Sequence, residues 1–476
     1  MSRKRQKERK ILEAVRIEEM AAEGKSLARL ENGKVLFVPF TAPGDLVDVQ
    51  LGRSRSSFAE GRVVKMLEPS PHRVEPRCRH FGTCGGCKWQ HVPYTMQLAM
   101  KERQVYDQLE RIGKIELKDR RSILGSKEIF EYRNKMEYTF SNKRWVTAEE
   151  MQEIGDGDVG CRAGLGFHIP GMFDKVLNIE ECHLQIDLSN RIRLFVRDFC
   201  LARPGQYPFF DLKEQVGYMR NLVIRTSSTG EVMVLVIFHE EDEEKSRTLL
   251  DAILERFGNE ITTLLYIVNP KRNDTYNDLD VVTYYGPGFI MEAMEELRFK
   301  VGPKSFYQTN SKQAYELYSQ VREMAGIQPH EVVYDLYTGT GTIACFLSKS
   351  ASKIVGIEYV EDAVIDARHN AEDNQLDNLT FFAGDMKDVL NDEFIRTHGK
   401  PDVIITDPPR AGMHQDVVET ILRAAPERIV YVSCNPATQA RDLAIMDSHY
   451  SVERVQPVDM FPHTHHVENI VLLHRR

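Results

Sequence analysis

Hydrophobic and polar positions follow two different periods in the C-terminal part of the chain, from about residue 301 to residue 476. Short runs rich in β-branched residues, typical of strands, lie at 332–337, 353–358, 379–383, 402–406, 428–434, 452–459 and 470–473. Amphipathic stretches typical of helices lie just after Gly341 and at 361–374, 414–424 and 437–446. Strands spaced by helices in this way predict a doubly wound α/β domain with a mostly parallel sheet.

Another pattern, of short apolar runs broken by turn residues, occupies residues 11–68. The runs lie at 28–30, 35–38, 46–51 and 61–66, with Glu-Asn-Gly at 31–33 and Ala-Pro-Gly-Asp at 42–45 between them. Regularly spaced short strands predict a small closed barrel, a fold that commonly binds oligonucleotides. Residues 1–10, mostly Arg and Lys, are predicted to be a disordered tail.

Helical and strand patterns are mixed between these two parts, in residues 69–300, which indicates an α+β domain. A helix is predicted at 96–112 and a strand at 136–140, whereas the polar, acid-rich segment 141–160 reads as a loop or insertion. Two apolar runs joined by a short polar turn predict a hairpin of 222–226 with 232–238. Further strands are expected at 263–268 and 281–285.

Composition adds the broad class of protein. The chain has 476 residues, 42% of them hydrophobic, without a run of about 20 apolar residues that would span a membrane. The first ten residues lack the apolar core of a secretory signal, so a cytoplasmic location is expected, with reduced cysteines. A net charge of −9 argues against indiscriminate wrapping of nucleic acid, but a basic stretch from Arg53 to Lys88 suits a selective polyanion partner. We expect a monomer.

Three cysteines lie close together at Cys78, Cys84 and Cys87, and Gly85 and Gly86 between the last two allow a tight turn. Clustered thiols in a reducing compartment indicate a metal centre, either zinc or an iron–sulfur cluster. Zinc motifs usually come as paired knuckles, so three cysteines plus one remote ligand suit a 4Fe–4S cluster better. The candidates for the fourth ligand are Cys182, Cys161, His80 and His91.

A glycine-rich turn after the first C-terminal strand, Asp335 to Gly341, predicts a nucleoside site at the carboxyl edge of the sheet. Glu358 ends the next strand, where an acid accepts the hydroxyls of a ribose, and Asp385 follows the third strand beside an expected adenine. Asp407 suits a cationic sulfonium. With Tyr337 and Thr342 on the turn, these residues predict an S-adenosylmethionine site. An NAD site is the alternative, disfavoured because the third glycine of its fingerprint is missing.

Cys434 ends a strand and is followed by Asn435 and a proline that opens a helix. A thiol at this edge is a candidate nucleophile, since the helix N-terminus and Asn435 favour its anion. The segment from Asp459 to Asn469 carries histidines and Glu468, where a proton acceptor is expected. His463, His465 and His466 as metal ligands are the disfavoured alternative, because their spacing matches no familiar zinc pattern.

Four segments resemble the motifs of the RNA uracil-5-methyltransferases: Phe306–Asn310, Asp407–Arg410, Ser433–Thr438 and Phe461–Glu468. Glu23–Gly24, Gly33–Val35, Pro43–Asp45 and Gly61–Val63 resemble a TRAM domain. The resemblance implies an α/β, Rossmann-like doubly wound methyltransferase domain at 301–476. It also implies an N-terminal OB-like TRAM barrel at 11–68 that binds RNA, and a central α+β domain at 69–300 with the cysteine cluster.

The same resemblance implies roles for single residues. Cofactor contacts fall on Gln308, Tyr337, Glu358 and Asp407, the nucleophile on Cys434, the general base on Glu468, and 4Fe–4S ligands on Cys78, Cys84, Cys87 and Cys182. The segment 141–160 places Cys182 further along the chain than the family usually shows, which keeps Cys161 as a rival ligand.

The barrel and the cysteine cluster together resemble the branch that methylates 23S ribosomal RNA. The expected reaction adds Cys434 to C6 of a flipped uridine, and Glu468 then removes the C5 proton after methylation. The alternatives are a transfer-RNA uridine methyltransferase, an amino-methyltransferase, in which an aromatic residue would replace Arg410, and a non-catalytic RNA-binding assembly factor.

Overall fold

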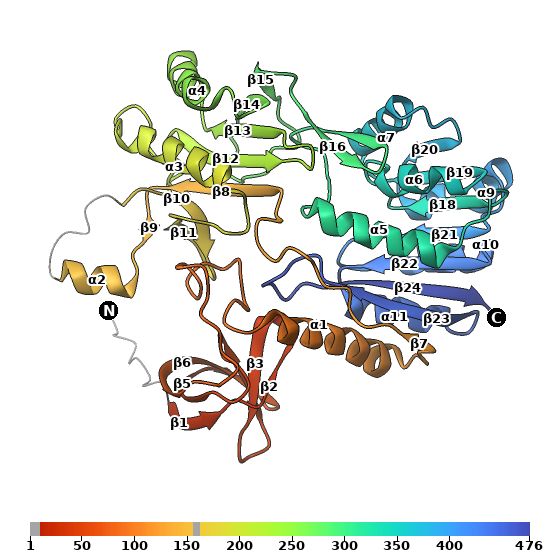
Figure 1. The fold of residues 1–476 in the computed structure, drawn as a ribbon, viewed down its shortest axis with the longest axis horizontal. Coiled ribbons are helices and arrows are strands. Elements are labelled where there is room, and N and C mark those ends of the chain that lie inside the picture. Colours follow the sequence, from red (N-terminus) through yellow and green to blue (C-terminus); the bar gives the residue numbers. More distant parts are fainter. Residues whose placement is uncertain (1–9, 156–161) are drawn as a thin grey trace, which may run out of the picture.

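The computed structural model describes residues 10–155 and 162–476, which form three large β-sheets (Figure 1). The predicted basic tail, apart from Lys10, and Cys161 lie outside the described residues. One sheet lies in the N-terminal part, one in the middle of the chain and one in the C-terminal part. Within the described residues, no helix is both long and apolar enough to cross a membrane.

The N-terminal sheet has six strands in the order β1-β5-β6-β4-β3-β2. Their bounds are Ile11–Arg16 (β1), Glu19–Met20 (β2), Lys25–Arg29 (β3), Val35–Pro39 (β4), Leu46–Ser54 (β5) and Phe58–Glu68 (β6). Alternate residues point inward, so that Leu36 and Val38 of β4 pack with Val47 and Val49 of β5 in a small core. The sheet confirms the expected β-rich N-terminal module, and β1 and β2 are strands that the pattern did not predict.

Helix α1 (Tyr94–Gln108), followed by a helical turn η2 (Leu109–Gly113), lies between the N-terminal and C-terminal sheets (Figure 1). It packs against α11 (Pro436–Met446) and the strand β23 (Tyr450–Val458), although about 350 residues separate these elements in sequence. A short strand after it, β7 (Asp119–Arg120), joins the edge of the C-terminal sheet. The N-terminal third of the chain is therefore attached directly to the C-terminal part.

The central sheet has eight strands in the order β15-β14-β13-β12-β8-β10-β11-β9. Their bounds are Lys135–Ser141 (β8), Arg144–Trp145 (β9), Gly164–Ile169 (β10), Met172–Asn178 (β11), Met219–Thr226 (β12), Val232–Phe238 (β13), Thr263–Val268 (β14) and Val282–Tyr285 (β15). Helices α3 (Asp187–Leu201) and α4 (Glu243–Phe257) pack on one face of it. The predicted hairpin of β12 and β13 is confirmed.

The prediction of a loop at 141–160 is wrong for the part that the structure describes. This segment contains β9 and helix α2 (Ala148–Ile154). A capping box starts the helix, because the Thr147 side chain accepts from Glu150 N while the Glu150 side chain accepts from Thr147 N. The acid-rich composition concealed a local signal that is strong enough to begin a helix.

The C-terminal sheet has the strand order β20-β19-β18-β21-β22-β24-β23-β7. The remaining bounds are Val332–Leu336 (β18), Lys353–Glu358 (β19), Leu379–Ala383 (β20), Val403–Thr406 (β21), Arg428–Ser433 (β22) and Glu468–Arg475 (β24). Strands β18 to β22 are parallel, and β24 runs antiparallel to both of its neighbours. The predicted mostly parallel sheet is confirmed, and β19 and β20 begin and end at the predicted residues.

Helices cover both faces of this sheet, as a doubly wound fold requires. On one face lie α5 (Ser311–Ala325), α6 (Thr342–Leu347) and α7 (Glu361–Asp373), which contact Val333 and Val430 through one core. On the other face lie α8 (Met386–Val389), α10 (Gln415–Ala424), α11 and α1, packed on Tyr334 and Tyr431. Helix α9 (Asp392–His398) is peripheral, and the hairpin of β16 (Ile290–Met294) and β17 (Leu297–Val301) precedes α5.

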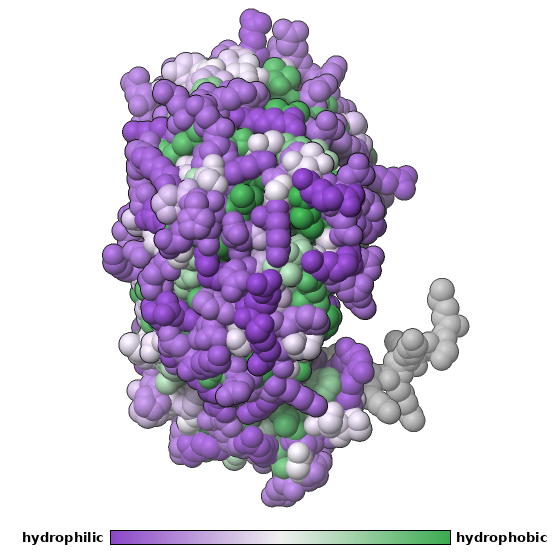
Figure 2. All heavy atoms as spheres, turned by 90° about the vertical axis from the view of Figure 1, so that its right-hand side faces the viewer, coloured by the Kyte–Doolittle hydropathy of each residue, from purple (hydrophilic) through white to green (hydrophobic). Residues whose placement is uncertain are grey.

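The surface at this end of the molecule is largely hydrophilic. Figure 2 shows polar side chains over most of the face, with hydrophobic residues only in small separate groups. The apolar residues of the strands are instead buried beneath the helices.

Candidate active site and cysteine cavity

A cavity of about 1350 Å³ lies at the carboxyl ends of β18, β19, β21 and β22. It exceeds the range of about 300–1,000 Å³ that is usual for one small-molecule ligand. Every residue predicted to bind the cofactor or to act in catalysis lines it: Gln308, Tyr337, Thr342, Glu358, Asp385, Asp407, Cys434 and Glu468. The volume and the lining together leave room for a nucleoside cofactor and a second ligand side by side.

The glycine-rich turn forms one wall of this cavity. Tyr337, Gly339 and Gly341 all have a positive φ, of 63°, 55° and 75°. Thr338 Oγ1 donates a 2.5 Å hydrogen bond to the buried Asp335 carboxyl, which closes the turn. A Cβ at Gly341 would lie 2.9 Å from Ala367, whereas a Cβ at Gly339 would meet open space. Gly341 is thus required by packing, and Gly339 by backbone conformation beside a space that a ligand can fill.

Two carboxylates stand at the ends of the next strands. Glu358 Oε2 accepts a 3.0 Å hydrogen bond from Gly339 N, and its Oε1 accepts another of 3.0 Å from Val360 N. Asp385 caps α8 by accepting from Lys387 N at 3.2 Å, and this contact with Lys387 lowers the pKa of Asp385. Both carboxylates are fixed in place at the cavity wall, as a ribose or adenine site needs.

Cys434 is half-buried directly after β22 and just before α11. Asn435 caps α11 by accepting from Ala437 N at 3.2 Å, and Pro436 occupies the first helical position. The Asn435 amide also donates to the Arg410 carbonyl at 3.0 Å, and Thr438 Oγ1 donates to the same oxygen at 3.2 Å. These bonds tie the cysteine turn to the Asp407–Arg410 loop across the sheet edge.

The electrostatic field at the thiol has two opposing parts. Burial, together with the nearby carboxyls of Glu468 and Asp407, raises the pKa of Cys434 to about 11. The Arg410 guanidinium contacts the thiol and lowers that pKa. The sequence indicated Arg410 only as a residue in the place of an aromatic one and did not predict its interaction with Cys434.

The buried carboxyl of Glu468 and the half-buried carboxyl of Asp407 line the cavity, and the buried carboxyl of Asp335 lies behind the glycine-rich turn. Burial raises the pKa of Asp335 to about 7, and burial together with the Asp335 charge raises that of Asp407 to about 7. The pKa of Glu468 is raised well above its ordinary value by burial and by Asp407, and is lowered by Arg410. A cation between such acids stabilises their ionised forms, and a sulfonium carries a positive charge.

The terminal segment 459–467 joins β23 to β24 and leads to Glu468. Burial lowers the pKa values of His463 and His466 to about 4, so both rings are neutral at pH 7. Of the three histidines in this segment, His466 alone lines the cavity that contains Cys434. Within the described residues, no group of three or more His, Cys, Asp or Glu side chains is arranged to hold a metal ion, and this includes these histidines.

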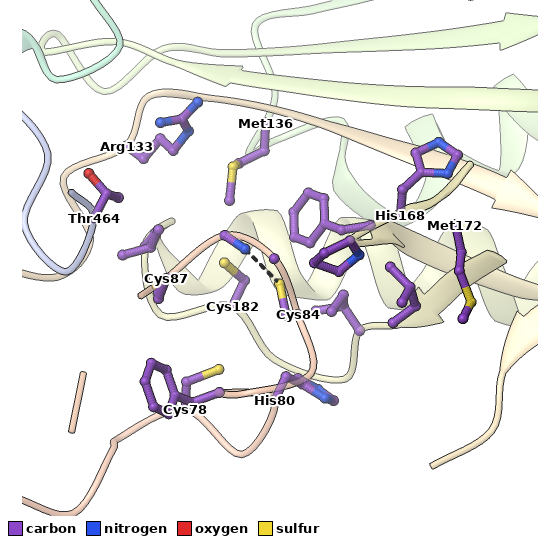
Figure 3. A pocket seen from close by; sticks show the side chains of 18 of the residues that line it. Cys78, His80, Cys84, Cys87, Arg133, Met136, His168, Met172, Cys182 and Thr464 are labelled. Carbon is purple, nitrogen blue, oxygen red and sulfur yellow. Dashed lines mark hydrogen bonds between the residues drawn. The ribbon is translucent and has the colours of Figure 1, made fainter. Parts of the chain in front are cut away.

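A separate cavity of about 1080 Å³ is lined by Cys78, Cys84, Cys87 and Cys182, and the labelled cysteines surround one space in Figure 3. Burial is the main cause of the raised pKa values of Cys78, Cys84 and Cys87. Charge on the nearby Cys182 thiol raises each of these three pKa values further. Gly86 N donates to Cys84 Sγ at 3.5 Å. A Cβ at Gly85 would lie 2.8 Å from Pro170, so the turn needs glycine there.

The other candidates for the fourth ligand have different surroundings. His91 Nε2 lies 3.1 Å from the Thr41 carbonyl and does not line this cavity. His80 does line it, but its Nε2 accepts a 3.0 Å hydrogen bond from Glu180 N. The structure thus brings four thiols around one cavity. Within the part of the chain that the structure describes, they do not form a ready-made site for a single metal ion.

Comparisons with known proteins indicate the family of the chain and its N-terminal domain. The family model described as tRNA (Uracil-5-)-methyltransferase matches residues 222–476, and the TRAM domain model matches residues 5–64. A protein named RNA methyltransferase from Porphyromonas gingivalis is 57% identical over 462 residues, covering 96% of this chain and 99% of its own length. Another of the same name from Bacteroides thetaiotaomicron is 59% identical over 460 residues, covering 96% of this chain and 100% of its own.

Among solved structures, the crystal structure of a tRNA (uracil-54, C5)-methyltransferase from Pyrococcus abyssi in complex with S-adenosyl-L-homocysteine is similar over nearly the whole chain. It has a TM-score of 0.74 and 28% sequence identity, and the match covers 97% of this chain and 100% of that one. The similarity therefore extends over all three parts of the fold.

Proposed function

Since the chain belongs to the tRNA (uracil-5-)-methyltransferase family of S-adenosylmethionine-dependent RNA methyltransferases, we propose that it methylates C5 of a uridine in RNA through a covalent cysteine adduct. Cys434 is the nucleophile and Glu468 the general base. One observation supports this most directly: the half-buried thiol and the buried carboxyl line the same cavity as the predicted cofactor residues. The cavity also has the volume for two ligands.

The chemistry explains why a thiol is needed. C5 of uracil is a weak nucleophile, so the Cys434 thiolate first adds to C6, forming a C–S bond and placing the electron pair on the C4 oxygen and C5. S-adenosylmethionine, when bound by Gln308, Tyr337, Thr342, Glu358, Asp385 and Asp407, supplies the methyl group that C5 takes. Glu468 then removes the C5 proton, the C5=C6 bond re-forms, and the sulfur leaves as thiolate.

The proposed reaction needs Cys434 as a thiolate and Glu468 as a carboxylate, so the bound ligands and the nearby charges must favour both ionised forms. Burial and neighbouring acids raise the pKa of Cys434 to about 11 and raise the pKa of Glu468 well above its ordinary value. Arg410 opposes both shifts. Helix α11 begins just after Cys434, and the positive end of its dipole favours the thiolate.

We propose 23S ribosomal RNA as the substrate, because the chain combines a TRAM domain with four thiols around one cavity. These cysteines are proposed to hold a 4Fe–4S cluster, which would cross-link the 78–87 loop to Cys182. Since methyl transfer consumes no electrons, the role proposed for the cluster is structural. Transfer RNA is the second candidate, favoured by the names of the matching family and of the Pyrococcus abyssi enzyme.

The test uses purified protein, labelled S-adenosylmethionine and unmodified transcripts of 23S rRNA and tRNA. The wild type should label one of the two RNAs at C5 of uridine. Cys434→Ala should lose both methyl transfer and the gel-stable protein–RNA adduct, whereas Cys200→Ala, a buried cysteine of α3 outside the cavity, should keep them. Glu468→Gln should accumulate the adduct, because the C5 proton cannot leave.

Other outcomes identify the rivals. Turnover by Cys434→Ala with label on an exocyclic amine indicates an amino-methyltransferase. RNA binding without transfer of label by the wild type indicates a non-catalytic assembly factor.

A further inference from the structure

A buried ion pair joins helix α1 to the segment that precedes Glu468. Lys101 Nζ lies 2.5 Å from Asp459 Oδ1, and both side chains are 0% exposed. The two residues are 358 positions apart in sequence. Removing two charges from water is costly, so a pair this deeply buried needs further hydrogen bonds to be tolerated.

Those further bonds hold the loop backbone. Asp459 Oδ2 accepts from the Tyr94 hydroxyl at 2.9 Å, and its Oδ1 accepts from Phe461 N at 3.0 Å. Lys101 Nζ also donates to the Phe461 carbonyl at 3.1 Å. Gln97, one turn before Lys101 on α1, accepts from His463 N at 2.9 Å. One face of α1 therefore binds the loop at Asp459, Phe461 and His463.

The loop is short and both of its ends lie in the sheet. Val458 of β23 pairs with Glu468 of β24, so residues 459–467 connect two antiparallel strands. Asp459 stands at the first end of this connection and Glu468 directly follows its last residue. Between them, Phe461 and His466 line the catalytic cavity with Glu468. A shift of the loop backbone at Asp459 would therefore also move the carboxyl of Glu468, which lines the cavity.

We propose that Lys101 is a positioning residue for the proton-removal step, holding the Asp459–Phe461 turn so that the Glu468 carboxyl meets the C5 proton of the adduct. This inference rests on the proposed function of Glu468. It assigns helix α1 a role in the second half of the reaction, after Cys434 has already bonded to the base. A displacement of about 1 Å in such a group typically costs about 100-fold in rate.

The test separates the two halves of the reaction in single turnovers. Lys101→Met protein is mixed with labelled S-adenosylmethionine and the RNA that the wild type methylates, and the formation and the decay of the covalent adduct are followed on denaturing gels. We expect formation within a few-fold of the wild type and decay slowed about 100-fold, so that the adduct accumulates. A merely structural role would lower the amplitude of both steps together and would not accumulate adduct.

Two variants keep the test decisive. Tyr94→Phe removes one hydrogen bond from Asp459 without leaving a charge unpaired, so it decides the matter if Lys101→Met does not fold; a smaller slowing of the same step is expected. Lys312→Met is the matched control, since Lys312 pairs with Glu128 on the surface, with side chains 72% and 46% exposed. It should leave both steps unchanged.

The Glu468→Gln variant, run in parallel, distinguishes the two ways of failing. If that variant accumulates adduct while Lys101→Met and Tyr94→Phe resolve it at the wild-type rate, the positioning role is wrong and the general base stands. If Glu468→Gln itself resolves the adduct normally, the assignment of the base is wrong and the inference about Lys101 fails with it.

Discussion

The side-chain amide of Asn435 donates a 3.0 Å hydrogen bond to the main-chain carbonyl of Arg410. The same side chain caps helix α11 through its oxygen, so one residue fixes both the turn that carries Cys434 and the loop that carries Arg410. The guanidinium of Arg410 in turn contacts the Cys434 thiol. Cys434 and its cationic neighbour are thus held in place by the side-chain hydrogen bonds of Asn435.

Replacing Asn435 by Ala should therefore impair the first step of the reaction more than it impairs folding. The loss of the cap costs about 1 kcal/mol of stability. Because the Arg410 loop also loses a bond to the cysteine turn, we expect adduct formation to slow by about 10- to 100-fold. Single-turnover gels measure the rate of formation, and thermal melting measures stability.

Asn391→Ala is the control, since Asn391 caps α9 in the same way, accepting from Glu393 N and Phe394 N, but its amide donates to the Asp388 carbonyl and not to the Arg410 loop. Equal losses of adduct formation in the two variants would contradict a specific role for Asn435.

The rate of adduct formation should rise with pH. Burial and the nearby carboxyls raise the pKa of Cys434 to about 11, so the thiolate is a minor species at pH 7. Below that pKa, each pH unit increases the thiolate about tenfold. We expect the single-turnover rate of adduct formation to increase by about this factor per unit between roughly pH 7 and pH 9.

Arg410→Met should lower that rate at every pH in this range, because it removes the cation that favours the thiolate and so raises the pKa of Cys434 further. Arg423→Met, an exposed arginine of α10, is the control. A rate that does not change with pH in the wild type would mean that the thiol is already ionised when RNA is bound.

Features of the fold and the site that depend on local sequence were predictable, whereas those that depend on tertiary structure were not. Strand patterns such as those of β19 and β20 are local, because each needs only a run of β-branched residues between turn signals. The capping box of α2 was equally local, but the acidic composition around it concealed it. The burial of Lys101 was not predictable, because its partner Asp459 is distant in sequence and a lysine on an amphipathic helix is normally exposed.

The same distinction applies within the cavity. Strand ends placed Asp407 and Cys434 at the same edge of the sheet, whereas the role expected for Glu468 came from the family resemblance. The contact of Arg410 with the thiol depends on how the two loops cross, and the bonds of Asn435 and Thr438 that set this crossing follow from tertiary structure.

Asp407→Asn should stabilise the free protein above neutral pH and weaken binding of the cofactor. Burial raises the pKa of Asp407 to about 7, above the value near 3.9 of an unfolded chain. The folded state therefore binds this proton more tightly, and the resulting stability, fully present below about pH 4, is lost as the pH rises through about 7.

Asparagine cannot ionise, so the variant avoids this loss of stability. At pH 8 its free energy of unfolding should exceed that of the wild type by on the order of a few kcal/mol, and its melting temperature should be higher. Both differences should be smaller at pH 5. Calorimetry should show weaker affinity for S-adenosylmethionine, since the carboxylate that suits the sulfonium is gone. Asp373→Asn, on the exposed end of α7, is the control. If the difference in melting temperature between Asp407→Asn and the wild type is the same at pH 5 and at pH 8, the pKa of Asp407 is not raised.

The proposed iron–sulfur centre predicts that Cys182 is required for iron to be retained. Cys78, Cys84 and Cys87 come from one loop, and Cys182 comes from a separate segment beyond β11, so it alone among the four joins the loop to the central domain. Without it, a cluster would keep three ligands on one side and lose its cross-link. Protein purified without oxygen should be brown and contain iron and sulfide, and Cys182→Ser should lose most of both.

Two further serine variants make this result specific. Cys200→Ser changes a buried cysteine of α3 that does not line the cavity, so iron content should be unchanged. Cys161→Ser tests the rival ligand and should also retain iron. Loss of iron from Cys161→Ser with retention in Cys182→Ser would exchange their roles, and a colourless wild type that contains zinc would replace the cluster by a zinc site.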